Sequence, residues 1–256
     1  MESSYHASEI GQHGIAFAAD RALNTADNIV TFKMVVRTVA KRHGMHATFM
    51  PKPRRDLQGS AMRLAFALLK DGKNVFTDEN DENKISETAY QFMAGIIEHV
   101  EGMALINNPI VNSYKRFVPG YNAPVKVTCS TRDREALIRM NNVGRGGTKL
   151  ELRSPDAASN PYLSLAVCLA AGLDGIERKL KAPVLDADIQ NIDKVMPKTL
   201  EDAIKAFEKD TYLKEVLGDH IVKHYRRNKP GTSKAGERHC KKREWHIRRP
   251  KITCTR

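Results

Sequence analysis

The stretch Asn108-Pro-Ile-Val-Asn-Ser-Tyr-Lys-Arg-Phe-Val-Pro-Gly-Tyr121 decides the fold, together with Leu150-Glu-Leu-Arg-Ser-Pro-Asp156 about thirty residues later. Proline and glycine divide the first stretch into turns, and its basic residues, among them Arg116, carry positive charge from these turns. In the second stretch Glu151 and Arg153 stand two apart, a spacing that puts both side chains on one face of a strand. A carboxylate beside a guanidinium suits an anionic substrate held next to a metal.

The spacing of apolar residues predicts an α+β fold, with antiparallel strands backed by long helices. The first helix, residues 25–43, should begin at Thr25 as its N-cap and stop at Gly44. Its apolar stripe is expected to consist of Ile29, Phe32, Val35, Val36 and Val39. Further helices are expected over residues 86–107, from Asn160 with Pro161 at its first position, and over 199–209 and 212–225. Strands are expected over residues 46–50, 62–68, 124–128 and 149–153, with a turn at Asp71-Gly72.

Composition limits the class of protein. The chain has 256 residues, 41% of them hydrophobic, which is enough for one large domain or two small ones. It has no run of about 18 or more apolar residues, so no transmembrane helix is expected. Its start lacks the basic-then-apolar order of a secretory signal. The four cysteines are scattered, and Cys129 and Cys168 fall in apolar segments, which is typical of reduced core residues. A cytoplasmic protein is the simplest interpretation.

The net charge of +12 is concentrated at one end of the chain. Residues 221–256 contain thirteen Lys or Arg and two Glu, so the preceding residues are nearly neutral. From residue 226 onward no period of 3.6 or 2 is sustained, and we expect residues 226–256 to be a disordered basic tail after a unit of residues 1–225. Nucleic-acid binding is an alternative, because basic residues surround Trp245. A zinc site at His239, Cys240, His246 and Cys254 would match no standard spacing.

Several short sequence motifs, in the same order along the chain, resemble those of glutamine synthetase of the bacterial and archaeal type. Besides the two opening stretches, Gly11-Gln-His13 is similar to part of that family's metal segment, and Ala47-Thr-Phe-Met-Pro-Lys-Pro53 to its strand and turn near the nucleotide. Asn160-Pro-Tyr-Leu163 is similar to the start of a long helix. The resemblance runs from about Glu2 to about His224 and implies a curved antiparallel sheet beside a funnel-shaped active site. The family's smaller N-terminal domain has no counterpart, so we expect a fragment that covers most of the catalytic domain.

The resemblance implies ATP-dependent ligation of ammonia to glutamate, with Mg or Mn as the metal and a homo-oligomer for a complete chain. Such a reaction needs metals and cations around the transferred phosphoryl group, and a carboxylate that takes a proton from ammonium. By position, the expected substrate and phosphate ligands are Arg116, Arg134, Arg139 and Arg153, while Lys52 and Ser60 fall in the nucleotide segments. Without the resemblance, these arginines would be read as surface or salt-bridging residues.

Most of the expected metal ligands are absent. The family patterns His-His-Glu and Gln-His-Glu read Tyr5-His6-Ala7 and Gln12-His13-Gly14 here, so both glutamates are lost. The family's Gly-Ser-Gly-Met-His reads Gly59-Ser-Ala-Met-Arg63, which puts a cation where the family has a ligand imidazole. Mg²⁺ and Mn²⁺ require oxygen ligands. Glu151 alone remains at an expected ligand position, and the surviving histidines are more often structural.

The proton acceptor is also missing, because the family's Pro-Gly-Tyr-Glu reads Pro119-Gly-Tyr-Asn122. The Asn122 amide can position ammonium through its carbonyl oxygen, but it cannot take a proton at neutral pH. Ala65 likewise replaces a polar, substrate-facing residue. These losses fall on positions that the reaction needs, whereas the neighbouring motifs that define the fold are intact. We therefore predict that the fold is kept and that ligation is impaired or lost. The alternative is a non-catalytic protein that joins or caps oligomers of an intact synthetase.

Overall fold

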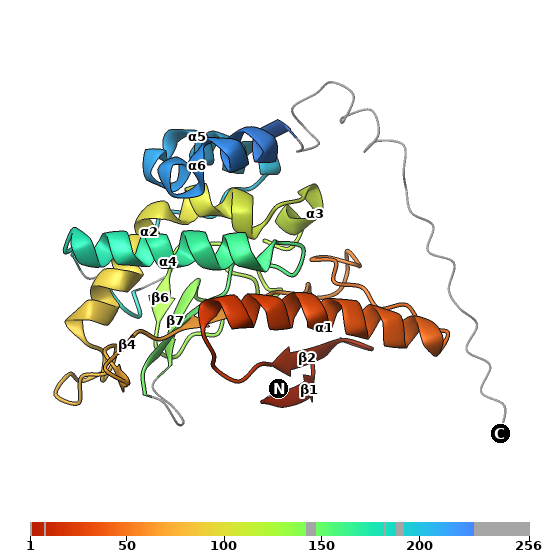
Figure 1. Cartoon of the computed structure of the whole chain (residues 1–256), viewed down its shortest axis with the longest axis horizontal. Helices are drawn as coiled ribbons and strands as arrows, with labels where there is room; N and C mark the ends of the chain where they lie inside the picture. The colour runs from red at the N-terminus through yellow and green to blue at the C-terminus, as the bar shows by residue number, and fades with distance from the viewer. Residues whose placement is uncertain (1, 8, 142–146, 182, 188–191, 228–256) are drawn as a thin grey trace.

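The computed structural model of the chain describes residues 2–7, 9–141, 147–181, 183–187 and 192–227. Two layers of helices cover one face of a small sheet (Figure 1). Helices α2 and α4 lie side by side next to the sheet, α5 and α6 pack on their other side, and α1 packs against α4 near the hairpin of β1 and β2. In chain order the elements are β1 (Ser3–His6), β2 (His13–Ala16), α1 (Ala22–Arg42), β3 (Leu64–Phe66), β4 (Leu69–Lys70), β5 (Lys73–Asn74), α2 (Glu87–Asn107), α3 (Val111–Tyr114), β6 (Cys129–Ser130), β7 (Ile138–Asn141), β8 (Lys149–Leu152), α4 (Pro161–Glu177), α5 (Leu200–Lys209) and α6 (Thr211–Arg227).

The main sheet has the strand order β3-β8-β7-β6. Leu64 of β3, Leu152 of β8 and Ile138 of β7 stand opposite one another, and all three are buried against the helices. Because side chains alternate across a strand, the intervening residues Glu151 and Arg139 lie on the other face. The sheet therefore has one apolar face for the core and one polar face that is available for chemistry.

The α+β prediction is confirmed, but several of its details are wrong. The sheet is not wholly antiparallel, because β6 and β7 pair in parallel. Residues 46–50 form no strand, and residues 124–128 contribute only an isolated bridge between Lys126 and Val195. Strand β7 was not predicted at all. Such short strands carry too few residues for a period of 2 to stand out, and long-range pairing decides them. The curvature expected from the family stays a prediction.

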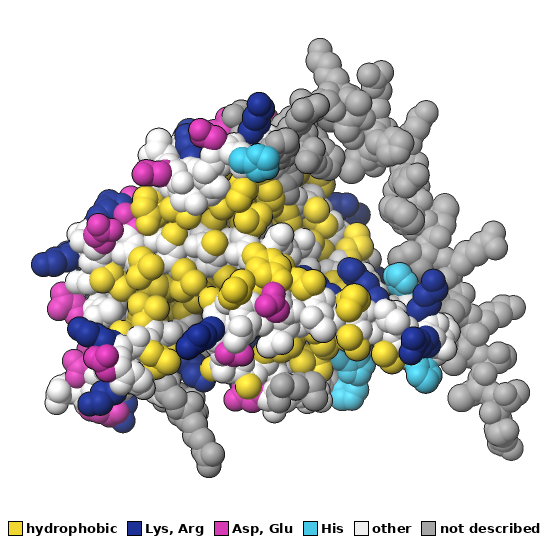
Figure 2. Space-filling model, viewed as in Figure 1, with side chains coloured by type: hydrophobic (Ala, Val, Ile, Leu, Met, Phe, Trp, Pro, Cys, Tyr) yellow, Lys and Arg dark blue, Asp and Glu magenta, His cyan; other side chains and the backbone are white. Residues whose placement is uncertain are grey.

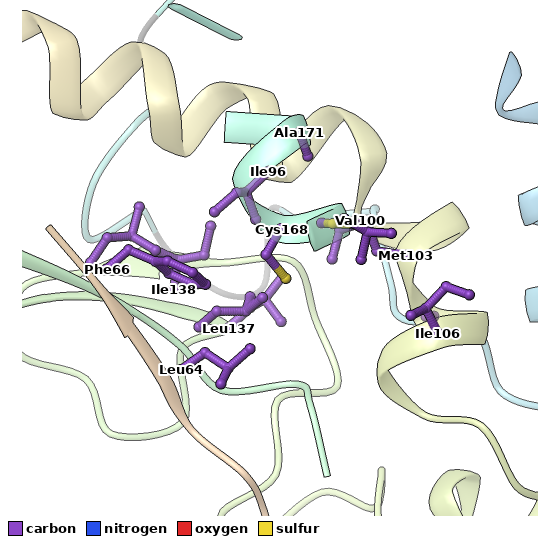
Figure 3. Packing of buried hydrophobic residues seen from close by; sticks show 14 of the residues in the cluster. Leu64, Phe66, Ile96, Val100, Met103, Ile106, Leu137, Ile138, Cys168 and Ala171 are labelled. Atoms are coloured by element: carbon purple, nitrogen blue, oxygen red, sulfur yellow. The ribbon is translucent and has the colours of Figure 1, made fainter. Parts of the chain in front are cut away.

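The core lies where α2 and α4 meet the sheet (Figure 3). Phe92, Met93 and Ile96 of α2 are completely buried there. The two helices touch at glycines: a Cβ added at Gly95 would lie 2.1 Å from the Ala171 carbonyl oxygen, and one added at Gly175 would lie 2.2 Å from the Gln91 carbonyl oxygen. Without side chains at this crossing the helix backbones approach closely, and α4 is seated on α2 and the sheet.

The predicted starts of three helices are confirmed, and in each a side chain caps the first turn. Ser86, Asn160 and Thr199 each accept hydrogen bonds from backbone N–H groups in the first turn of α2, α4 and α5. The turn at Asp71-Gly72 is also confirmed, since both residues have positive φ and join β4 to β5. The N-cap prediction at Thr25 is wrong, because α1 begins at Ala22. Asp20 Oδ1 accepts from Arg21 N at 2.7 Å, and a carboxylate before the first turn favours this earlier start.

The predicted apolar stripe of α1 is only partly buried. Ile29 packs inside, whereas Val35 and Val39 are 47% and 46% exposed and Met34 is 63% exposed. Figure 2 shows apolar side chains spread across the face of the molecule that carries α1 and α4. Periodicity identified the amphipathic helix, but it could not show that part of the stripe faces solvent in this chain.

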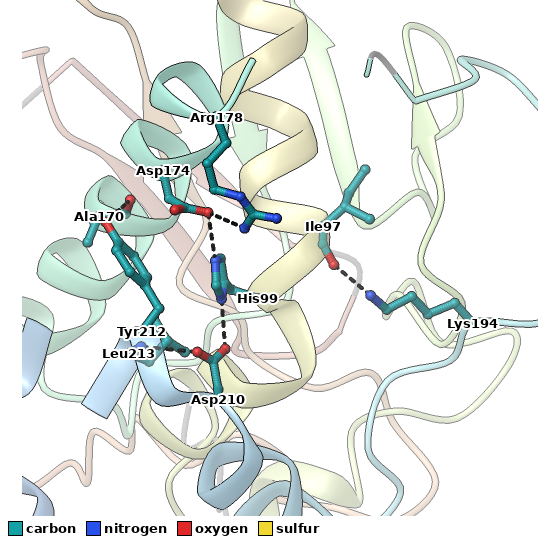
Figure 4. A network of polar contacts seen from close by, with 9 residues as sticks. All are labelled: Ile97, His99, Ala170, Asp174, Arg178, Lys194, Asp210, Tyr212 and Leu213. Atoms are coloured by element: carbon teal, nitrogen blue, oxygen red, sulfur yellow. Dashed lines mark hydrogen bonds and ion pairs between the residues drawn. The ribbon is translucent and has the colours of Figure 1, made fainter. Parts of the chain in front are cut away.

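A polar network joins α2, α4 and the α5–α6 junction (Figure 4). His99 of α2 lies between two carboxylates, with Nε2 3.1 Å from Asp174 Oδ2 and Nδ1 2.8 Å from Asp210 Oδ2. Arg178 donates to the same Asp174 oxygen at 2.8 Å, and the Tyr212 ring lies 5.1 Å from the imidazole, centroid to centroid. Since ionised carboxylates only accept, His99 satisfies both of them when both of its ring nitrogens are protonated.

The predictions for the basic tail, including its nucleic-acid and zinc alternatives, concern residues that lie almost entirely outside the described part of the chain. The last described helix, α6, continues to Arg227, slightly beyond the predicted end at Tyr225. No helix among the described residues is long and apolar enough to cross a membrane.

Candidate active site

Strand pairing gathers charged side chains on the polar face of the sheet. The register places Glu151 of β8 between Ala65 of β3 and Arg139 of β7. Asn141 lies two residues beyond Arg139 on the same face of β7, and its Nδ2 donates to Glu151 Oε2 at 3.3 Å. Glu151 therefore stands in the middle of a row that crosses three strands, with its side chain only 15% exposed.

Two arginines meet the second oxygen of Glu151. Arg153 Nε lies 3.3 Å and Arg63 Nη1 lies 3.8 Å from Glu151 Oε1. Arg153 follows two residues after Glu151, so both lie on the same face. Arg63 directly precedes β3, and continuing the pairing of β3 with β8 by one residue places it opposite Arg153. The Arg63 side chain is 49% exposed, whereas that of Arg153 is 4% exposed. The carboxylate of Glu151 is thus neutralised by protein cations.

Arg116 is 3% exposed, and its charge interacts with those of Arg153 and Arg63. It follows the short helix α3, its guanidinium donates to the Ser154 carbonyl, and it lies over the Phe117 ring at 4.9 Å. Burial lowers the pKa of Arg116 to about 10, although the neighbouring carboxylate of Asp156 opposes this, and the charges of Arg153 and Arg63 lower it further. Arg116 is therefore still a cation at neutral pH, held close to two others.

The loop of residues 51–60 closes over Arg116. A Cβ added at Gly59 would lie 2.7 Å from Arg116 Cγ and 2.5 Å from the Pro51 carbonyl oxygen, so only glycine permits this approach. Lys52 Nζ donates to the Leu57 carbonyl and lies 3.9 Å from the centre of the Tyr121 ring. Burial lowers the pKa of Lys52 despite the opposing charges of nearby carboxylates. In this arrangement Lys52 holds the loop together from the inside.

The remaining predicted residues lie around the rim. Ser60 Oγ is 3.1 Å from Gln12 Nε2, which joins the loop to the turn between β1 and β2. Asn122 is exposed with φ at 53°, and its Nδ2 donates to Gln58 Oε1 at 3.0 Å. Arg134 is exposed in the segment between β6 and β7. The structure thus brings together Arg116, Arg139, Arg153, Arg63 and Glu151. The role of Arg134 stays a prediction.

Comparison with known proteins decides the family. The family model described as "Glutamine synthetase, catalytic domain" matches residues 1–247. The chain belongs to the glutamine synthetase catalytic-domain family. The glutamine synthetase of Clostridium saccharobutylicum is 48% identical over 236 residues, and that of Thermus thermophilus is 46% identical over 235 residues. Each of these matches covers 88% of this chain and 53% of the relative, so the chain spans about half the length of the curated relatives it matches.

A likeness to solved structures agrees with this family. The structure described as "GmaS/ADP complex-Conformation 1" superposes with a TM-score of 0.75 at 36% identity, covering 88% of this chain and 53% of that one. The structure described as "Apo GmaS without ligand" gives a TM-score of 0.74 at the same identity. The resemblance inferred from the sequence words is therefore confirmed at the level of the family and of the mixed α+β fold.

The residues of this site do not fit the divalent metal implied for glutamine synthetases. The guanidinium of Arg63 lies against Glu151, the one carboxylate left at an expected ligand position. The β1–β2 hairpin places His6 opposite His13 with their rings 4.8 Å apart, but no carboxylate in the described part of the chain forms a metal-binding group with them. Within the described ranges, no three His, Cys, Asp or Glu side chains are grouped so that they could hold a metal ion.

In the β1–β2 hairpin, the Tyr5 ring fills the space beside Gly14, where the family pattern predicts a metal-binding glutamate. Gly14 stands opposite Tyr5, and a Cβ added at Gly14 would lie 2.2 Å from the Tyr5 ring. A glutamate at position 14 therefore requires the tyrosine ring to move. The sequence predicted lost ligands at Ala7 and Gly14 but not this packing, because nothing local to Gly14 indicates which strand lies across from it. It also missed Asn141 and Gln58 as partners of Glu151 and Asn122 for the same reason.

Proposed function

We propose that this chain derives from the catalytic domain of an ATP-dependent ligase that joins ammonia to glutamate, and that its metal-dependent ligation is impaired or lost. The ion pair between Arg63 and Glu151 carries the proposal, because it puts a fixed cation where the family has a metal ligand. A divalent ion entering the site would meet the like charges of Arg63, Arg153 and Arg139. No step of the proposed function therefore runs through a metal in this chain.

The anion-holding part of the site supports descent from such a ligase. Guanidinium groups suit both substrate carboxylates and phosphates, and Arg116, Arg139 and Arg153 lie together on one face of the fold. Under this proposal they hold the glutamate carboxylate and the phosphates of ATP, with Arg134 at the edge. The ADP named for the related GmaS complex agrees with a nucleotide ligand.

The other predicted residues take lesser parts in the proposal. Lys52 and Ser60 shape the loop that covers Arg116, where a nucleotide phosphate would enter. Asn122 orients ammonium through its amide but takes no proton. A unit of residues 1–225, a separate basic tail and a cytoplasmic location complete the proposal.

Calorimetric titration with Mn²⁺ tests the loss of the metal site. The purified chain is titrated alone and with ATP, beside the intact synthetase of Thermus thermophilus. Binding that is absent or only millimolar in this chain, with tight binding in the control, supports the proposal. Micromolar binding to this chain would mean that a surrogate ligand set exists around Glu151, and the reasoning from Arg63 would be wrong.

Restoring the chemistry provides a second test. The residues to change are Ala7, Gly14, Arg63, Ala65 and Asn122, in a chain that also carries an N-terminal half from an intact relative. Because the Tyr5 ring occupies the space over Gly14, a Tyr5→Ala substitution must accompany them. ADP release that depends on glutamate and ammonia is the readout. Persistent inactivity of a folded, Mn²⁺-binding protein would show that these losses do not explain the defect.

A second candidate function is association with intact synthetase subunits without catalysis. The exposed apolar side chains of α1 favour it, since Met34, Val35 and Val39 form part of a stripe left open to solvent. Light scattering after mixing with the intact Thermus thermophilus enzyme tests this candidate. A complex that is lost in Met34→Glu, while the variant still melts cooperatively, would support it. If the two proteins elute separately from a size-exclusion column coupled to the light-scattering detector, this function is excluded for that partner.

A further inference from the structure

The polar face of the sheet carries more guanidinium groups than carboxylates. The arginine cluster consists of Arg63, Arg116, Arg139 and Arg153. Arg63 and Arg139 both act electrostatically on Arg153, and Arg63 and Arg153 both act on Arg116, so Arg153 is coupled to each of the other three charges. The carboxylates against them are Glu151 inside the cluster, Asp156 next to Arg116, and the exposed Asp133 at the edge. Such a cluster is repulsive unless an anion joins it.

Several buried donors of the cluster have no hydrogen-bond partner among the described residues. They are Arg116 Nε and Arg139 Nε, and Arg153 Nε lies near Glu151 without a hydrogen-bonding angle. A buried N–H group without a partner is destabilising, and a charged one more so. A ligand with several acceptor oxygens would satisfy these donors and offset the repulsion at the same time.

Arg63 differs from the other three arginines because it is half-exposed. Its Nη1 lies 3.8 Å from Glu151 Oε1, a distance longer than a hydrogen bond, so its other donors are open to an incoming group. A guanidinium presents a planar fork that matches two oxygens of a phosphate. The side chain stands where the family has a metal-ligating imidazole, and it brings positive charge to the same place from the protein itself.

We propose that the arginine cluster binds a phosphate oxyanion without a divalent metal, with the Arg63 guanidinium supplying the charge that a metal supplies in the family. This inference rests on the proposed function, because it concerns the same site. Several adjoining guanidinium groups favour a ligand that carries more than one negative charge, and an excess of donors favours phosphate oxygens over a single carboxylate. Inorganic pyrophosphate is therefore a suitable probe.

The test is calorimetric titration of the whole chain with pyrophosphate in excess EDTA. We expect saturable binding that weakens at higher salt, since the site is partly exposed. Arg63→Gln should weaken binding about tenfold or more, as expected for loss of one charge-assisted contact. The matched control Arg42→Gln removes an exposed arginine at the end of α1 and should bind like the unchanged chain. Thermal melting confirms that both variants fold.

A further variant separates this proposal from a metal-mediated site by the sign of its effect. Glu151→Gln removes the negative charge inside the cluster, so it should tighten pyrophosphate binding in EDTA. If Glu151 served through a metal, the unchanged chain would not bind pyrophosphate in EDTA, and with Mn²⁺ present the same change would weaken binding. The proposal is overturned if the unchanged chain does not bind in EDTA, if Arg63→Gln binds equally well, or if Glu151→Gln binds more weakly. The Mn²⁺ titration reports on the proposed function separately, since no pyrophosphate is present in it.

Discussion

Replacing His99 with Gln should remove a pH-dependent part of the stability of this fold. His99 is 7% exposed, and its imidazole donates to Asp210 at 2.8 Å and to Asp174 at 3.1 Å, which joins α2 to α4 and to the start of α6. Burial by itself lowers the pKa of His99, but the hydrogen bonds and charges of the two carboxylates outweigh it, so the pKa is raised. The protonated form is therefore the one that the folded structure stabilises.

The magnitude follows from the two charge-assisted hydrogen bonds. Each contributes roughly 1.5–3 kcal/mol, and a Gln amide can replace one of them as a neutral donor. Asp174 keeps its ion pair with Arg178 in the variant, whereas Asp210 loses its cation. We expect His99→Gln to lower the free energy of unfolding by about 2–4 kcal/mol near pH 6, where the unfolded-state imidazole is also largely protonated.

The sign of the pH dependence is opposite to that of a salt-bridged carboxylate. Since the folded-state pKa of His99 lies above its unfolded value of about 6.5, its contribution is complete below that value. The contribution disappears as the pH rises through the raised folded-state pKa. The stability difference between the unchanged chain and His99→Gln should therefore shrink as the pH rises above the unfolded-state pKa of about 6.5.

Urea unfolding followed by circular dichroism at several pH values measures this difference. His46→Gln, which changes an exposed histidine after α1, is the matched control and should have little effect at any pH. A difference for His99→Gln that stays constant or grows as the pH rises would refute the reasoning. The double-mutant cycle with Asp210→Asn should give a coupling free energy of about 1 kcal/mol or more at the lower pH.

Three further predictions concern the scaffold. Gly95→Ala should lower the melting temperature markedly, with a loss of roughly 1–3 kcal/mol, because the added methyl group would press on the backbone near Gly175; unchanged melting would contradict the close crossing. Ser86→Ala should cost about 1 kcal/mol in urea unfolding through loss of the α2 N-cap, and Ser86→Asn should restore it. Burial raises the pKa of Cys129 and Cys168 to about 12, so with the other two cysteines changed to serine, neither thiol should react with Ellman's reagent at about pH 8 until the chain is unfolded.

The sequence by itself determined the features that depend on neighbours along the chain. Ser86, Asn160 and Thr199 were recognisable as helix starts because an N-cap hydrogen bond spans only two or three residues. The turn at Asp71-Gly72 was recognisable because those residues adopt positive φ more readily than most. The family's sequence motifs and the substitutions within them, such as Arg63, were also recognisable, since each motif is a contiguous run of residues.

Only the tertiary structure decided which distant residues meet. The pairing of Arg63 with Glu151 depends on β3 lying beside β8, and the two carboxylates of His99 are 75 and 111 residues away along the chain. The parallel pairing of β6 with β7 and the solvent-facing part of α1 were likewise hidden from any local pattern. The physical reason is that hydrophobic periodicity identifies a face that can be buried, whereas the partner that covers it, and the charges brought together as a result, depend on contacts between segments far apart in sequence.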